Sequence, residues 1–256
     1  MARAKGTMIA VTSTKGGVGK TILTLNLAGI YQDLKKRVLI IDMDLYGGAI
    51  ALNLNLNPDK TIYHFVDDLS NNRYHSFYDY VLKYNEQIDI LSCPKDPRQA
   101  NKIDAKYIEM ILDNAIYRYD VILIDTSHTL TPVNISVLDM ATVILYVMPN
   151  DPIDLKNTKS FLAILHDIEK ENVKVVLNDS RDQDLNYFST FDIKNVIRHN
   201  IDYTISASFH IRNISKYLLE GQILVENTSL SFRDFRDYDK LKKMATDLLP
   251  EVKEEK

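Results

Sequence analysis

Seven consecutive residues, from Lys15 to Thr21, hold three glycines, two lysines and a threonine. This segment, KGGVGKT, follows a short apolar run and precedes a helical pattern, and in that context a glycine-rich loop binds phosphate. Backbone N–H groups of such a loop point at phosphate oxygens, and the positive end of the helix dipole adds to the attraction. We expect these residues to bind the phosphates of a nucleotide: Gly16, Gly17, Val18, Gly19, Lys20, Thr21 and Ile22.

Two side chains of the loop have specific expected roles. Lys20 would place a cation between the β- and γ-phosphates, and the Thr21 hydroxyl would ligate the Mg²⁺ that bridges the same oxygens. The alternative is a glycine-rich turn that binds nothing. The order strand, loop, lysine–threonine and helix makes that alternative much the weaker of the two.

Three aspartates follow two other apolar runs. Asp42 and Asp44 end the segment RVLIIDMD, and Asp125 ends the segment YDVILID. Carboxylates at the C-terminal ends of parallel strands lie at the edge where open α/β sheets bind ligands. We expect Asp125 and Asp42 to face the Mg²⁺ and its water shell, and Asp44 to orient or deprotonate an attacking water. Any one of them could instead be a solvated strand end or a helix cap, but three beside a phosphate loop favour a metal site.

The elements that must position these residues are visible as alternating patterns. Short β-branched runs alternate with amphipathic segments of helical length, which is typical of a mostly parallel sheet covered by helices on both faces. We predict an α/β P-loop NTPase fold with seven or eight strands. The predicted strands are Met8 to Thr12, Arg37 to Ile41, Gln87 to Ser92, Val121 to Ile124, Thr142 to Met148, Val173 to Leu177 and Asp202 to Ile205. The predicted helices are Lys20 to Leu34, Asp104 to Tyr117, Asp154 to Glu171, Ile211 to Glu220 and Asp237 to Leu248.

Composition bounds the class of protein. The sequence has no internal repeat and no Gly/Ser/Pro-rich linker, so we expect one domain over residues 1–256. A net charge of −4 gives no overall attraction to nucleic acid or anionic lipid, although a local basic patch stays open. The one cysteine, Cys93, excludes an internal disulfide and is expected in the core. The N-terminal apolar stretch is too short for a signal peptide and no run is long enough to span a bilayer, so we expect a cytoplasmic protein.

The loop STKGGVGKT, with its extra Lys15, resembles the deviant Walker A motif of the ParA/MinD ATPases. Asp42, Asp44 and Asp125 match the next two landmarks of that family, and the resemblance covers most of the chain. It implies an ATPase that uses ATP and Mg²⁺ and forms a homodimer with the nucleotide sandwiched between the chains. In that dimer Lys15 would reach the partner's ATP phosphates, so the implied catalytic residues are Lys15, Lys20 and Asp44.

The resemblance also suggests a base-contacting residue and a branch of the family. Asn178, the last residue of VKVVLN, would contact the adenine edge, although an asparagine after a strand is otherwise an ordinary turn residue. The chain is similar to the TadZ/CpaE branch, which is associated with Flp-type pilus assembly. Tyr46 and Ser127 depart from the glutamine and proline that are common at these positions. The segments that carry this similarity are DMDLYGGAIALNLNLNPDKTIYHFVDDL, DLKNTKSFLAIL and NISKYLLEGQILV.

Three classes of function stay open on the sequence alone. The first is a positioning ATPase whose dimer recruits a protein partner, and the second is a partition ATPase whose dimer binds DNA. Arg198, Arg212 and Lys216 are candidates for DNA contacts, but solvated helix faces explain them better in an acidic chain. The third is a small-molecule enzyme on the same fold, such as a ligase or a reductase with a cysteine-held cluster. That reductase needs two cysteines per chain, and the sequence has one.

Two further features are expected to be non-catalytic. The C-terminal LLPEVKEEK is acidic and interrupted by Pro250, which argues against direct docking on a membrane. His128 follows the Asp125 segment, and we expect a surface residue that forms hydrogen bonds rather than a catalytic group.

Overall fold

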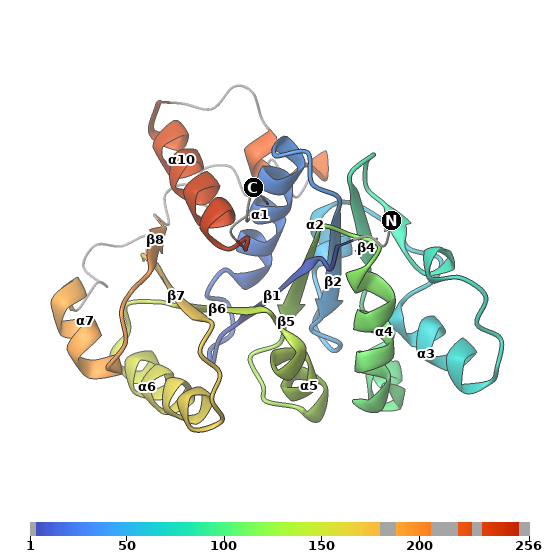
Figure 1. Cartoon of the computed structure of the whole chain (residues 1–256), viewed down its shortest axis with the longest axis horizontal. Helices are drawn as coiled ribbons and strands as arrows, with labels where there is room; N and C mark the ends of the chain where they lie inside the picture. The colour runs from blue at the N-terminus through green and yellow to red at the C-terminus, as the bar shows by residue number, and fades with distance from the viewer. Residues whose placement is uncertain (1–3, 180–187, 206–219, 227–231, 251–256) are drawn as a thin grey trace, which may run out of the picture.

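Eight strands form one sheet in the order β3-β4-β2-β5-β1-β6-β7-β8 (Figure 1). The computed structural model describes residues 4–179, 188–205, 220–226 and 232–250. Among these residues every strand pairing is parallel except that of the short edge strand β3 with β4. The strands are β1 (Thr7–Thr12), β2 (Val38–Met43), β3 (Leu82–Lys83), β4 (Ile88–Leu91), β5 (Val121–Thr126), β6 (Val143–Met148), β7 (Val173–Asn178) and β8 (Tyr203–Ile205).

Helices cover both faces of the sheet, as Figure 1 shows for α1 and α10 on one side and α4, α5 and α6 on the other. The first face carries α1 (Lys20–Asp33), α2 (Ile50–Asn53), the 3₁₀ turn η4 (Leu224–Glu226) and α10 (Phe232–Asp247). The second face carries α3 (Ile62–Ser70), η1 (Phe77–Asp79), η2 (Pro97–Lys102), α4 (Lys106–Ile116), α5 (Pro132–Met140), α6 (Pro152–Asp167) and α7 (Thr190–Ile197). The predicted fold class is therefore confirmed. Of the helices in the described ranges, none has the length and apolar character needed to cross a membrane.

Strand β1 shows why the sheet forms two cores. All six of its residues are buried, and successive side chains point to opposite faces. Met8 and Ala10 pack with the α3 to α7 layer, while Ile9 and Val11 pack with α1 and α10. A continuous apolar run is what such a doubly covered strand requires.

Two predicted strands, Arg37 to Ile41 and Val121 to Ile124, end earlier than the observed strands at the edge of the sheet that holds the site. β2 continues to Met43 and β5 to Thr126, so Asp42 and Asp125 lie inside strands rather than after them. The parallel register pairs Asp42 with Asp125 directly. The sequence pattern stopped at the apolar residues Ile41 and Ile124, but the backbone ladder continues two residues beyond each.

Other differences follow from local turn chemistry. The sequence missed β3, α5 and α7, which are two, nine and eight residues long. The predicted helix to Glu171 ends at Asp167, because Glu169 takes a left-handed backbone with φ of 59°. The last helix begins at Phe232, five residues before the predicted Asp237. The predicted helix 211–220 lies outside the described residues except for its last position.

Gly29 gives a prediction about the packing of α1 against η4. A Cβ at Gly29 would lie 2.5 Å from Val225 Cγ2 and 2.9 Å from Ile223 Cγ2. Alanine is favoured over glycine in a helix by about 1 kcal/mol, but overpacking a core costs about 1–3 kcal/mol. We expect Gly29→Ala to lower the free energy of unfolding by about 1 kcal/mol in urea denaturation.

Val225→Ala supplies the control because it removes the nearer of the two clashing methyl groups. The loss in the double variant should be smaller than the sum of the two single losses. A Gly29→Ala protein as stable as the wild type would show that the contact is not tight.

Candidate functional site

The phosphate loop connects β1 to α1 and needs glycine at two places. Gly17 and Gly19 have φ of 74° and 97°, which is the left-handed region that other residues rarely adopt. A Cβ at Gly19 would also lie 2.6 Å from the amide nitrogen of Asn178. The loop therefore curves tightly while another strand contacts its backbone. Its last residue, Gly19, is the N-cap of α1, so Lys20, Thr21 and Ile22 form the first turn of the helix.

Lys20 is a nearly buried cation at the start of α1. The residue is 9% exposed, and Nζ donates a hydrogen bond of 3.1 Å to Ser13 Oγ. Ser13 Oγ in turn donates to the carbonyl oxygen of Lys15 at 2.7 Å. Burial lowers the pKa of Lys20, while the charges of Asp125 and Asp44 act in the opposite direction. A buried ammonium group with one hydroxyl acceptor among the described residues is poised to bind an anion.

Thr21 and Asp125 are joined directly across the top of the sheet. Thr21 Oγ1 donates a hydrogen bond of 2.6 Å to Asp125 Oδ2. Asp125 is 1% exposed, and its other oxygen, Oδ1, is buried without a hydrogen-bond partner in the described part of the chain. A hydroxyl and a carboxylate with a free oxygen are the hard oxygen donors that Mg²⁺ prefers, so these residues fit that ion.

The carboxylates of Asp42 and Asp125 are neighbours in the strand register, and both have raised pKa values. Burial raises the pKa of Asp125 to about 7, against the smaller lowering effects of Thr21 and Lys20. Burial, and then the charge of Asp125, raises the pKa of Asp42 well above its ordinary value. Without a cation, the pair favours a protonated state at neutral pH.

Asp42 is bound mostly to backbone. Its Oδ1 accepts a hydrogen bond from Asp44 N at 3.2 Å, and its Oδ2 accepts one from Ile50 N at 3.1 Å. The Cys93 thiol also donates a hydrogen bond to this carboxylate. Cys93 is partly exposed, so it lies beside the site rather than in the core as predicted. Asp42 thus holds the segment from Asp44 to Ile50 in place. Asp44 is half-buried, and its Oδ1 accepts a weaker 3.3 Å bond from Gly47 N.

Lys15 contacts the start of α6 within its own chain. Its Nζ lies 3.5 Å from Asp151 Oδ2, and both side chains are partly exposed. Asp151 is the N-cap of α6, and its Oδ1 accepts from the backbone N–H groups of Ile153 and Asp154. The cross-subunit role expected for Lys15 concerns a dimer and stays a prediction.

Asn178 ends β7 against the phosphate loop. Its Nδ2 donates a hydrogen bond of 2.8 Å to the carbonyl oxygen of Val18. Its Oδ1 is buried, and no described residue donates to it. The amide therefore tethers the loop, and the adenine contact expected of it stays a prediction.

A polar network beneath the loop was missed by sequence reasoning. Thr14 Oγ1 lies 2.6 Å from the hydroxyl of Tyr146, which lies 3.1 Å from Thr158 Oγ1. Thr14 Oγ1 also donates to Asp154 Oδ1 at 3.4 Å, and burial raises the pKa of Asp154 to about 6. These residues come from the loop, β6 and α6, and no sequence spacing links them. The network fixes the start of the loop against the second face of the sheet.

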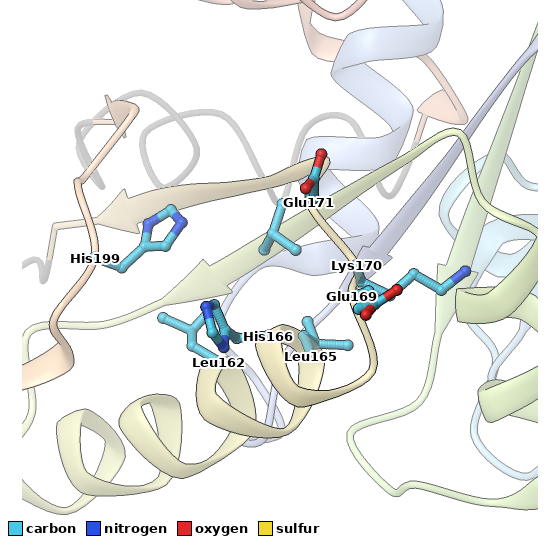
Figure 2. A pocket seen from close by; sticks show the side chains of 8 residues that line it. Leu162, Leu165, His166, Glu169, Lys170, Glu171 and His199 are labelled. Carbon is cyan, nitrogen blue, oxygen red and sulfur yellow. The ribbon is translucent and has the colours of Figure 1, made fainter.

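A groove lies elsewhere, between α6, the start of β7 and the segment before β8 (Figure 2). It has a volume of 690 Å³, and Figure 2 shows His166 and His199 at its sides. No residue of the phosphate loop lines it. Among the candidate DNA contacts, Arg198 is exposed at the C-cap of α7 and directly precedes His199, which lines this groove. Arg212 and Lys216 lie outside the described residues. The phosphate loop and its carboxylates therefore remain the candidate site.

The pKa of Asp125 predicts a pH dependence of stability. The folded protein keeps a proton on this group from its ordinary value of 3.8 up to about 7, whereas the unfolded chain has released it. The free energy of unfolding therefore falls as pH rises through that window. We expect the metal-free Asp125→Asn protein to lose less stability than the wild type between about pH 5 and pH 8.

Denaturant unfolding at several pH values, in a chelating buffer, measures this effect. Asp59→Asn, at an exposed aspartate, is the control and should follow the wild type. Parallel pH profiles for Asp125→Asn and wild type would contradict the argument.

The comparisons with known proteins agree with this geometry. Residues 9–222 match the family model described as CobQ/CobB/MinD/ParA nucleotide binding domain. The chromosome-partitioning ATPase Soj of Thermus thermophilus is 26% identical over 175 residues, which cover 66% of this chain and 65% of Soj. The chain thus spans just under two thirds of the length of that relative.

Two solved structures share the fold. A ParA family ATPase from Chlorobium tepidum superposes with a TM-score of 0.82 at 19% identity, over 96% of this chain and 99% of that one. The septum site-determining protein MinD of Pyrococcus horikoshii, complexed with Mg-ADP, superposes with a TM-score of 0.77 at 21% identity, over 95% and 96%. Since the family model covers most of the sequence, the chain belongs to the CobQ/CobB/MinD/ParA family of nucleotide-binding domains.

Proposed function

We propose that the protein is an ATP-dependent molecular switch. It binds and hydrolyses Mg·ATP as a homodimer, and its nucleotide state controls the recruitment of a partner in a positioning or assembly system. The observation that carries this proposal is the 2.6 Å bond from Thr21 to Asp125, whose second oxygen is buried and unpartnered in the described residues. A nearly buried Lys20 lies at the same helix start.

Each residue of the site has a distinct task in this proposal. Thr21 and Asp125 hold Mg²⁺, with Asp42 facing its water shell, and the ion supplies neutralising charge to the phosphate oxygens. Lys20 binds the same oxygens from the loop side. Asp44 orients an attacking water, because it is less buried than Asp42 and makes only one weak backbone contact.

Dimerisation is assigned to Lys15. Its side chain is 47% exposed, and its ion pair with Asp151 is partly exposed and therefore weak. In the dimer, Lys15 would leave Asp151 and bind the phosphates of the ATP on the partner chain. These phosphates carry more negative charge than one carboxylate. The switch thus couples ATP to assembly through a residue that is accessible in the single chain.

The cellular machine is proposed to be a Flp-type pilus or a related positioning system. The support is the similarity of the Asp42 to Leu69 segment, and of DLKNTKSFLAIL, to the TadZ/CpaE branch. The protein would act in the cytoplasm and be brought to a membrane or pole by its partner.

Partition of DNA is the second candidate, and the similarity to the chromosome-partitioning Soj favours it. An ATP-dependent, salt-sensitive shift of nonspecific DNA would support it, because phosphate contacts release counterions. Genes for a pilus ATPase or a secretin beside this one would favour the first candidate.

Lys15→Ala should leave ATP binding by the single chain intact and abolish ATP-dependent dimerisation and hydrolysis. The reason is that its proposed contact is made across the interface. Sedimentation with a nonhydrolysable ATP analogue measures dimerisation, and phosphate release measures turnover. Lys83→Ala, on the exposed edge strand β3, is the control and should behave as wild type. A Lys15→Ala protein that dimerises and hydrolyses normally would refute the cross-subunit role.

Asp44→Asn tests the attacking-water role with little change in shape. Asparagine can still accept the bond from Gly47 N but cannot accept a proton. We expect ATP binding to survive and hydrolysis to fall by about 10²–10⁴-fold, which is typical of losing a general base. The variant should accumulate as an ATP-bound dimer that outlasts the wild-type dimer. Calorimetry and phosphate release decide this, and a wild-type rate of hydrolysis rules out the role.

A further inference from the structure

His128 lies against the phosphate loop. It belongs to the segment that joins β5 to α5, three residues after Asp125. A Cβ built on Gly16 would lie 3.6 Å from His128 Nδ1, 3.7 Å from Cε1 and 3.9 Å from Cγ. These are ordinary van der Waals distances, so the edge of the imidazole is in contact range of the first glycine of the loop.

The backbone on both sides of His128 is anchored. Asn134, which is 3% exposed, donates from Nδ2 to Ser127 Oγ at 2.6 Å and to the carbonyl oxygen of Thr129 at 2.8 Å. Thr131 caps α5 by accepting a 3.2 Å bond from Asn134 N. A single buried amide therefore fixes the residues before and after His128. The ring is held at the phosphate loop by the fold rather than by contacts of its own.

The imidazole itself is exposed and has no hydrogen bond or ion pair among the described residues. His64 shows the contrast, because its Nδ1 accepts a 3.1 Å bond from Thr61 N in the capping box of α3. His128 does no comparable structural work. Its ring nitrogens remain available to a ligand of the loop.

We propose that His128 contacts the terminal phosphate of bound ATP and makes the site discriminate ATP from ADP. This inference rests on the proposed function and deepens it. The ring contacts the loop at Gly16, directly after Lys15, and its own segment follows β5, with His128 three residues after Asp125. An imidazole carries at least one N–H donor in either protonation state, and a phosphate oxygen is a strong acceptor. Gly16 has no side chain that would block the approach of the imidazole to a phosphate bound at the loop.

Two substitutions separate the N–H donor from the ring. His128→Phe keeps an aromatic ring against Gly16 and removes both nitrogens, whereas His128→Gln keeps an N–H donor. His166→Phe, at an exposed histidine of the remote groove, is the matched control (Figure 2). Thermal unfolding of all variants verifies that each is folded.

The measurement is calorimetry with Mg·ADP and with a nonhydrolysable ATP analogue. Because a hydrogen bond to a charged phosphate oxygen would be lost, His128→Phe should weaken binding of the analogue by about tenfold or more. ADP affinity should stay within about twofold, since the lost contact concerns only the terminal phosphate. His128→Gln should recover part of the loss, and the control should match the wild type.

The outcomes distinguish the two proposals. Equal weakening of ADP and the analogue, or no weakening of either, would overturn the role of His128 while leaving nucleotide binding in place. A wild-type protein that binds neither nucleotide would overturn the proposed function and this inference with it.

Discussion

Two buried carboxylates in adjacent parallel strands are the constraint on which the site depends. The register that pairs β2 with β5 places Asp42 beside Asp125, and burial leaves neither charge well solvated. The raised pKa values of both groups express the free energy stored there. A divalent cation held near them would stabilise their charged forms.

Further contacts connect this pair of carboxylates to other segments at the same edge of the sheet. Thr21 connects Asp125 to the first turn of α1, and Asp42 connects β2 to the segment leading to α2. Lys20 adds a buried positive charge to the same region. Any change in the charge of the carboxylate pair therefore acts on the phosphate loop and on the segment of Asp44 together.

The fold class could be predicted from the sequence, and so could the position of the KGGVGKT loop, because it lies between a clear strand and a clear helix. The sequence pattern placed Asp42 and Asp125 one step outside their strands, since apolar patterns cannot show how far a backbone ladder continues. Short elements such as β3 and α7 carry too few residues for a period to be recognised. The network of Thr14, Tyr146 and Asp154 was beyond prediction, because only the tertiary fold brings those residues together.

Asn178 has a consequence for the identity of the base. Its side-chain nitrogen, Nδ2, already donates a hydrogen bond to the carbonyl oxygen of Val18. Its side-chain oxygen, Oδ1, is the atom that lacks a partner among the described residues. A purine edge that reached this buried oxygen would therefore meet an acceptor. Adenine presents an amino group there and guanine a carbonyl oxygen, so the first would be satisfied and the second repelled. Selectivity for ATP over GTP would then follow from the tether that holds the phosphate loop in shape.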